Sequence, residues 1–298
     1  MPYRLRKREP VSDGTKRILL EQTGAIVTAL SDRAGEVDER IHDVRKRIKR
    51  VRAVLRLVTL KLDRDALEVR ESVLRAVARK LAAARDATVA LECFEEISVH
   101  FTGGAVERIR QLLADAVRVA KRKSLSPDKL LALAGEIRSA VAIFSRVGTV
   151  LEGWPALEIG LADSYRTTRK QVRAAFADPD VDRLHEARRH AKWLWEQLRM
   201  LRRALPKPIA RLLPRLDKFA DLLGRYHDFY LLQKTLNEAS AHGLEVAKFP
   251  PLHGCLNREM GKCLKRARKM AAELFALRPK AMLARLHDGW RQWHKEPE

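Results

Sequence analysis

Apolar residues recur every three or four positions through most of this 298-residue chain. That spacing places their side chains on one face of an α-helix. The clearest run lies between Ile41 and Val58, where successive apolar residues are 3, 4, 3, 4 and 3 positions apart. A run between Leu184 and Leu201 has the same spacing. Because glycine is scarce and leucine, alanine and arginine are abundant, the pattern predicts an all-α protein.

Proline, glycine and capping residues divide the chain into two halves, each with five predicted helical stretches. The boundary is Gly153-Trp154-Pro155, which gives a basic N-terminal segment at 1–11 and halves at 12–153 and 154–298. The first half is predicted to hold helices at 15–30, from the break at 31–35 to near Leu62, at 65–99 with Asp63 as cap and a kink near Arg85, at 105–123, and at 127–150 with Ser126 as cap. The second half is predicted to hold helices at 157–176, between Pro179 and Pro206, at 209–240, from Pro251 to Leu277, and at 279–293.

The composition predicts a soluble protein with an acidic partner. The chain is 46% hydrophobic, enough for a substantial core, and carries a net charge of +22. Such an excess causes self-repulsion, so nucleic acid, polyphosphate and an anionic membrane surface are the partners to consider. No signal peptide and no membrane span is evident, and three scattered cysteines favour a reducing compartment. We therefore expect a cytoplasmic protein.

Basic residues form a stripe on each of the two regular apolar runs, one position after the apolar residues. The first stripe is His42, Arg45, Lys49, Arg52 and Arg56, and the second stripe is His185, Arg188, Lys192 and Arg199, with Arg189 beside it and Trp195 in the place of one cation. A step of one residue turns about 100° around a helix, so both stripes flank the buried seam. The first stripe is about 21 Å long at about 1.5 Å per residue, which suits a long polyanion better than one small ligand.

A second correspondence between the halves indicates an internal duplication. His185 follows His42 by 143 positions, and the segment 222–236 parallels 81–94 at an offset of 142, which aligns Asp228 with Asp86. Two coincidences at nearly one offset predict two similar antiparallel helical bundles related by a pseudo-twofold axis. If that axis brings the stripe helices together, both stripes line one basic central groove or channel.

The doubled stripe, together with Arg85-Asp86 and His227-Asp228, resembles the CHAD domain, a conserved histidine α-helical domain. The resemblance extends from about residue 12 to 293. It implies a pair of helical bundles whose basic central surface binds inorganic polyphosphate without catalysis, and frequent association with polyphosphate granules. Trp195 departs from the pattern, since the first copy has Arg52 there.

The chemistry of the stripe residues favours phosphate independently of the resemblance. Arginine binds phosphate oxygens through two parallel hydrogen bonds, and lysine supplies a mobile point charge. A polymer that contacts several weak sites at once gains affinity through effective concentration. Neighbouring helices supply further candidate phosphate-binding residues, which are Lys16, Arg17, Arg118, Lys121, Arg122, Arg166, Arg169, Lys170, Lys262, Arg266 and Lys269.

Several alternatives stay open for individual residues and for the whole chain. His42 and His185 suit phosphate contact, a structural role or, with little support from spacing, a metal. Asp86 and Asp228 are expected to orient stripe arginines. No glycine-rich phosphate loop, nucleophile elbow or HExxH is found, so we predict no catalytic residue, cofactor or metal. A nucleic-acid-binding protein and an enzyme acting on phosphate anhydrides are the competing functions.

Overall fold

The computed structural model describes residues 3–32, 34, 36–58, 64–146, 148–243 and 249–295. These residues form α-helices and short 3-10 helices, and no β-strand occurs among them. The all-α prediction is confirmed. None of the helices in these ranges is apolar over a length that would cross a membrane.

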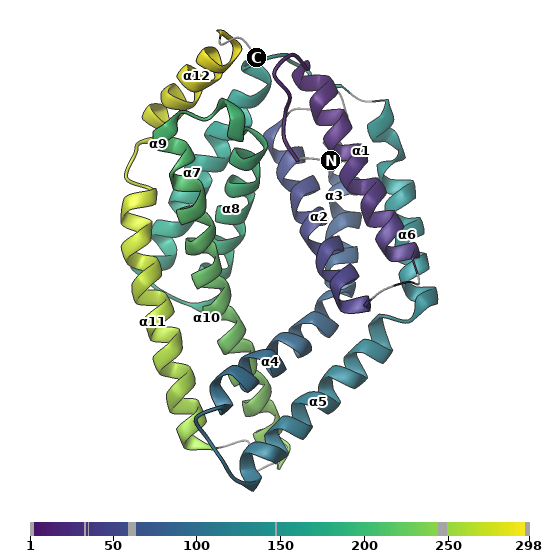
Figure 1. The fold of residues 1–298 in the computed structure, drawn as a ribbon, viewed down its shortest axis with the longest axis vertical. Coiled ribbons are helices and arrows are strands. Elements are labelled where there is room, and N and C mark those ends of the chain that lie inside the picture. Colours follow the sequence, from purple (N-terminus) through teal and green to yellow (C-terminus); the bar gives the residue numbers. More distant parts are fainter. Residues whose placement is uncertain are drawn as a thin grey trace.

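The helices follow one another along the chain with short connections (Figure 1). The first half holds α1 (Val11–Ser31), α2 (Val37–Leu57), α3 (Arg64–Lys80), α4 (Ala82–Ser98), α5 (Gly104–Ser124), α6 (Pro127–Val141) and the 3-10 turn η1 (Ala142–Ser145). The second half holds α7 (Pro155–Ala177), α8 (Val181–Met200), the 3-10 turn η2 (Arg202–Ala204), α9 (Lys207–Ala210), α10 (Leu212–Ala241), α11 (Pro250–Leu274) and α12 (Pro279–Lys295).

Two consecutive predicted helices of the first half have other bounds in the structure. The stripe helix α2 ends at Leu57, and the predicted end at Leu62 and cap at Asp63 lie outside the described residues. The predicted helix 65–99 is divided at Leu81 and is not kinked at Arg85. The break falls at a leucine and not at a glycine or proline. Leu81 has helical dihedral angles and is fully buried.

The first residues of α8 and α6 show two ways in which the sequence begins a helix. The Asp180 carboxylate accepts a hydrogen bond from the backbone N–H of Arg183 at 2.9 Å, which caps α8. At α6, by contrast, Ser126 occupies the cap position without a side-chain hydrogen bond, and Pro127 at the first position supplies the start signal. The predicted helix 127–150 ends earlier, at Val141, and continues as η1.

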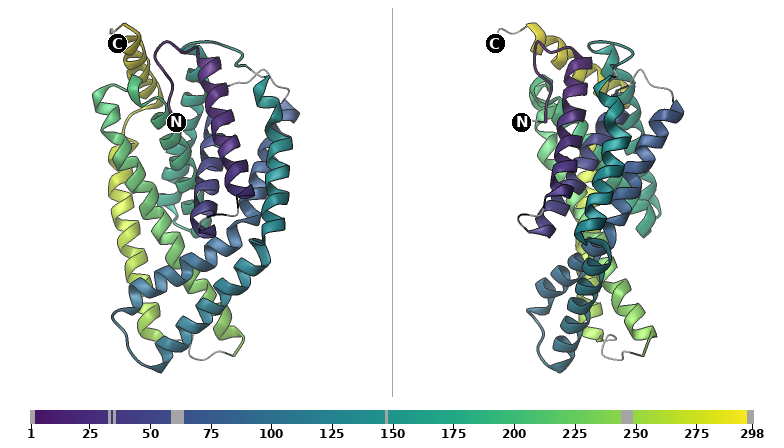
Figure 2. Two further views of the ribbon diagram at one scale, coloured as in Figure 1. Left: turned by 45° about the vertical axis from the view of Figure 1, so that its right-hand side comes forward. Right: turned by 90° about the vertical axis from the view of Figure 1, so that its right-hand side faces the viewer.

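The stripe helices α2 and α8 pack against each other at the centre of the molecule. Helix α1 lies against α2, while α7 and α10 lie against α8. Helix α4 reaches from the first half to α10 and α11, and α5 lies along α4 (Figures 1 and 2). The packing of α2 against α8 therefore places both stripes in one region.

One hydrophobic core runs through both halves. It contains Ile48 and Val51 of α2, Leu194 and Leu198 of α8, and side chains of most neighbouring helices. Within it, the fully buried amide of Gln197 donates a hydrogen bond to the backbone carbonyl of Ala53 at 3.1 Å. A second cluster joins α4 and α5 to α10 and α11. Contacts across the boundary at 153 and 154 therefore belong to the core of the molecule.

Candidate anion-binding site

The apolar seam between α2 and α8 positions both stripes. Ile41, Val44 and Ile48 on α2, like Leu184 and Ala187 on α8, are at most 4% exposed. The stripe residues follow these positions by one, so their side chains leave the edge of the seam. Burial of the seam thus fixes where the cations lie, as the spacing predicts.

The two stripes meet at Lys49. Burial, together with the positive charges of Arg188, Arg45 and Lys192, lowers the pKa of Lys49 to about 8, and the negative charge of Glu196 opposes this shift. Lys49 as a residue is nevertheless exposed to solvent. Cations from both helices therefore repel one another at this point.

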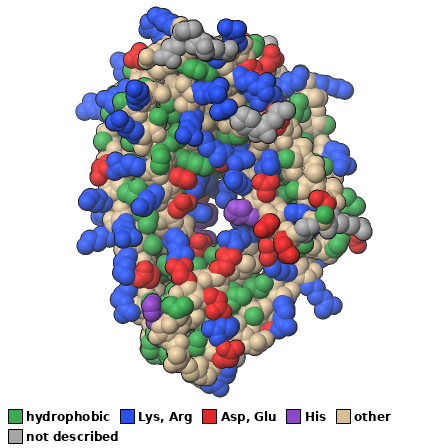
Figure 3. Space-filling view, in the orientation of Figure 1, with side chains coloured by type: hydrophobic (Ala, Val, Ile, Leu, Met, Phe, Trp, Pro, Cys, Tyr) green, Lys and Arg blue, Asp and Glu red, His purple; other side chains and the backbone are tan. Residues whose placement is uncertain are grey.

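A hollow lies at the centre of the face drawn in Figure 3. Lysine and arginine side chains lie in and above it, a histidine lies at its edge, and acidic side chains lie around its lower rim. The hollow lies where the ribbon of Figure 1 shows α2 and α8 above α4. Basic and acidic side chains therefore both lie around this concave region.

Arg45 and Arg188 are held by contacts with the backbone of their neighbours. The guanidinium of Arg45 donates to the backbone carbonyl of Ala78 at 3.3 Å. Arg188 lies over Gly224 of α10, where a Cβ atom would come within 2.9 Å of the arginine Nε. The buried Nε of Arg188 has no hydrogen-bond acceptor among the described residues. A buried donor without a partner is unfavourable, and an anion in the hollow would relieve it.

Carboxylates form ion pairs with several cations of both stripes. Glu71 accepts ion pairs from Arg52 at 3.1 Å and from Arg56 at 2.5 Å. Lys192 lies 2.6 Å from Asp217 and 2.8 Å from Asp221. On the second stripe, Arg199 lies 2.8 Å from Glu196. The free positive charge is therefore greatest around Arg45, Lys49 and Arg188.

The two tryptophans of α8 support arginines from different sides of the helix. Trp193 is buried, and the guanidiniums of Arg52 and Arg56 lie 5.1 and 4.1 Å from its ring centroid. The guanidinium of Arg199 lies 4.6 Å from the ring centroid of Trp195. Cation–π contact orients the guanidinium without neutralising it. Trp195 thus replaces a stripe cation with a side chain that positions the next one.

Both stripe histidines are disfavoured as cations in the free protein. Burial, and then the positive charge of Arg85, lowers the pKa of His42. Burial and the neighbouring His227 lower the pKa of His185 to about 4, and the two rings lie 4.9 Å apart. At neutral pH His185 is therefore uncharged, and a phosphate contact from it would use a neutral N–H.

The two predicted structural acids lie close to the stripes without pairing with them. Burial raises the pKa of Asp86, and the positive charge of Arg45 opposes that rise. Asp228 lies 4.0 Å from His227. Among the described residues, no ion pair joins either acid to a stripe arginine, so their orienting role stays a prediction.

Many of the predicted additional cations are engaged elsewhere. Arg17 pairs with Glu9 at 2.7 Å, and Arg169 donates to the backbone carbonyl of Phe275 at 3.0 Å. Carboxylates also lie against several others, namely Lys121 with Asp38, Arg118 with Asp115, Arg166 with Asp163 and Lys262 with Glu259. Lys16 is half-buried, and the side chains exposed to solvent are Arg122, Lys170, Arg266 and Lys269. Phosphate contact by these residues stays a prediction.

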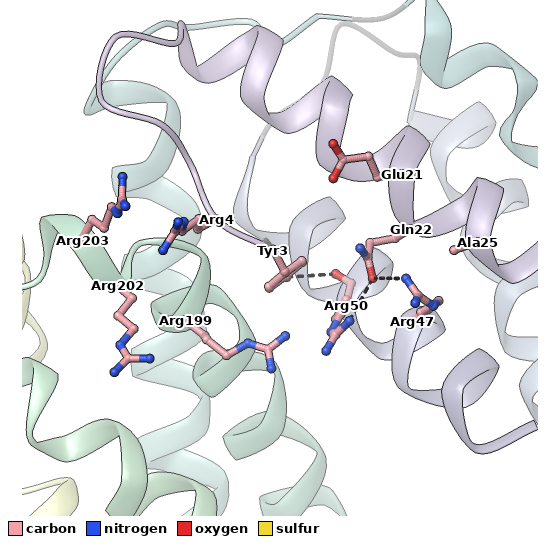
Figure 4. A pocket seen from close by; sticks show the side chains of 10 residues that line it. All are labelled: Tyr3, Arg4, Glu21, Gln22, Ala25, Arg47, Arg50, Arg199, Arg202 and Arg203. Carbon is pink, nitrogen blue, oxygen red and sulfur yellow. Dashed lines mark hydrogen bonds between the residues drawn. The ribbon is translucent and has the colours of Figure 1, made fainter. Parts of the chain in front are cut away.

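The structure also brings together arginines that the stripe pattern did not single out. They line a cavity of about 800 Å³ (Figure 4) and are Arg4, Arg47, Arg50, Arg202 and Arg203, together with Arg199 of the second stripe. Arg4 belongs to the predicted basic N-terminal segment, which the sequence marks by composition alone. Arg47, Arg50 and Arg203 lie off the helical phase of the stripes, so periodicity gave no signal for them, whereas Arg202 continues the spacing of the second stripe just beyond the end of α8.

The fold and site define a class of all-helical proteins with two central, packed helices that each carry a cationic stripe. The chain belongs to the CHAD domain family, since the sequence model of that family matches residues 17–237. A crystal structure of the CHAD domain from the plant Ricinus communis is similar, with 18% sequence identity, a TM-score of 0.49, and coverage of 92% of this chain and 89% of that chain. None of the curated proteins compared with the chain matches it.

Proposed function

We propose that the chain binds inorganic polyphosphate, without changing it chemically, in a central basic groove lined by both stripes. The observation that carries the proposal is the environment of Lys49. Burial and the positive charges of three residues on two helices lower its pKa to about 8. A polyanion in the groove would turn this repulsion into attraction.

A polymer suits the arrangement better than a single phosphate. The cations follow two helices, and the resemblance between the halves supports a pseudo-twofold pairing of Arg45 with Arg188 and of Lys49 with Lys192. A chain of linked phosphates would contact cations of both stripes in succession, and each contact raises the effective concentration of the next. Family membership supports the same ligand.

The proposal assigns no catalytic residue. Asp217 and Asp221, which lie beside the second stripe, are paired with Lys192. Glu71 is shared by Arg52 and Arg56. Carboxylates paired in this way are suited to holding the cations in place and not to binding metal ions for hydrolysis.

A competition experiment tests this function. We expect labelled long-chain polyphosphate to bind the full chain at about physiological salt and to be displaced poorly by duplex DNA at equal phosphate concentration. Fluorescence polarisation measures the displacement of the labelled polymer by DNA relative to its displacement by unlabelled polyphosphate, which is the reference competitor. Equal displacement by DNA would identify a general nucleic-acid binder, and steady release of orthophosphate or a shortened polymer would identify an enzyme.

Binding should also take up a proton at alkaline pH. The pKa of Lys49 is about 8 in the free protein, and a bound polyanion should move it back toward 10.5. Between these values the free form lacks the proton and the bound form has it, so binding weakens as pH rises and is accompanied by uptake of about 0.7 proton at about pH 8.5. Titration calorimetry in buffers of different ionisation enthalpy measures the uptake.

A single substitution tests whether Lys49 is the group that takes up this proton. In Lys49→Met the uptake at alkaline pH should disappear, whereas the unaltered chain retains it. Uptake of the same size in Lys49→Met would show that another group titrates and would contradict this assignment.

A further inference from the structure

The arginine cavity of about 800 Å³, to which the second stripe contributes Arg199, carries a further inference. Its volume falls within the range of roughly 300–1,000 Å³ typical of small-ligand sites. It is formed by the N-terminal segment, α1, α2, α8 and η2, so it lies between the two halves (Figure 4). We propose that it is a second, compact binding site for a short condensed phosphate.

The charge of the cavity favours an anionic ligand. Among the described residues that line it, six are arginines and one, Glu21, is acidic, and the Glu21 carboxylate already pairs with Arg17 at 3.4 Å. In the described chain, no carboxylate forms an ion pair with Arg4, Arg202 or Arg203. These three guanidiniums therefore remain available for phosphate oxygens.

Arg50 and Arg199 extend toward each other beneath Tyr3 (Figure 4). Both guanidiniums share one buried carboxylate, Glu196, which lies 2.8 Å from Arg199 and 3.8 Å from Nε of Arg50. That Nε is buried and has no hydrogen-bond acceptor among the described residues. A phosphate would supply the missing acceptor, and two arginines at close range would bind it through several charge-assisted bonds.

The N-terminal segment closes the cavity from above. The hydroxyl of Tyr3 donates to the backbone carbonyl of Arg50 at 3.4 Å, and the backbone N–H of Leu5 donates to the carbonyl of Met200 at 3.0 Å. The segment therefore joins α2 to α8 and holds Arg4 over the cavity. Residues outside the regular stripes thus complete a bounded site.

The residues that line the cavity favour a condensed phosphate over a nucleotide. Its one aromatic ring, Tyr3, is already contacted by Arg50 at 5.4 Å and by Arg199 at 4.9 Å, so a nucleobase would find no free ring on which to stack. Six arginines in one cavity suit several adjacent phosphate groups. A short condensed phosphate provides them, either as a free oligophosphate or as the end of a polyphosphate chain.

Inorganic triphosphate is the probe, and titration calorimetry on the full chain at about physiological salt is the measurement. Arg202 and Arg203 are exposed on η2, so Arg202→Ala/Arg203→Ala should fold normally. We expect this variant to lose at least tenfold in triphosphate affinity. Arg108→Ala/Arg138→Ala, which removes two exposed cations of α5 and α6, is the charge-matched control and should change it less than twofold. A thermal melt checks the fold of each variant.

A stripe variant separates this site from the proposed function. Arg45→Gln/Lys49→Met should keep its triphosphate affinity within threefold while it loses affinity for long-chain polyphosphate. The reverse result, with triphosphate binding lost in the stripe variant and intact in Arg202→Ala/Arg203→Ala, would overturn the second site. Absence of triphosphate binding to the unaltered chain at millimolar concentration would overturn it too.

Polyphosphate with esterified ends identifies the source of the ligand. If the cavity takes chain ends, esterification should weaken binding to the unaltered chain and leave Arg202→Ala/Arg203→Ala unaffected. If esterification changes neither while triphosphate still binds in the cavity, the ligand is a free oligophosphate. Both results support the site, and they distinguish the end of a polyphosphate chain from a free oligophosphate as its ligand.

Discussion

Arg45→Glu/Lys49→Glu is expected to lower the affinity for long-chain polyphosphate by more than 100-fold. Both residues lie where the two stripes meet. A hydrogen bond to a charged group contributes about 1.5–3 kcal/mol, so two lost contacts remove about 3–6 kcal/mol. Because each 1.4 kcal/mol is about a factor of ten, that loss exceeds 100-fold before repulsion by the new carboxylates is counted.

Two comparisons separate lost binding from lost folding. Arg108→Glu/Arg138→Glu makes the same change in net charge on exposed parts of α5 and α6 and should lower affinity only a few fold. Arg45→Gln/Lys49→Met avoids new negative charge next to Asp86, and the lowered pKa of Lys49 indicates that losing its charge does not destabilise the fold. Equal loss of affinity in the control would show that only net charge matters.

The affinity for polyphosphate should fall roughly 50-fold between about 50 and 200 mM monovalent salt. Neutralising a phosphate of a flexible strand changes the logarithm of affinity by about 0.7 per tenfold change in salt. Four central cations, Arg45, Lys49, Arg188 and Lys192, then give a slope of about −3, and a fourfold increase in salt gives the stated loss. Binding isotherms at several salt concentrations measure the slope.

The slope of the salt dependence also measures the number of phosphates that the protein neutralises. In Arg45→Gln/Lys49→Met it should become shallower by about 1.4, because two neutralised phosphates are lost. Short chains that reach only part of the stripes should show a shallower slope and a lower affinity than long ones. A slope near zero, or one unchanged in the variant, would mean that these cations do not contact the polymer.

The central helices could be predicted from sequence because local spacing determines them. Apolar residues at intervals of three and four fix the buried side of α2 and α8, and the burial of Ile48 and Leu194 confirms it. The position of the stripes beside the seam follows from the same geometry. Family membership could also be predicted, and the matched residues 17–237 include both stripes.

The remaining features depend on contacts between segments far apart in sequence. The break at Leu81 has no local signal, because this leucine is packed at a change of helix direction. Glu71 neutralises Arg52 from another helix, and Gly224 makes room for Arg188 from α10. The arginine cavity requires an N-terminal segment folded across two helices, which periodicity does not encode.

The hydrogen bond from Gln197 to Ala53 has a consequence for protein engineering. A fragment ending at Gly153 would leave Ala53 without its donor and would expose the apolar seam of α2 to water. Such a fragment should aggregate, so a miniaturised phosphate-capture tag cannot be made by bisecting this chain. Shortening would have to begin at the distal ends of α5, α10 and α11, away from the packing of α2 against α8.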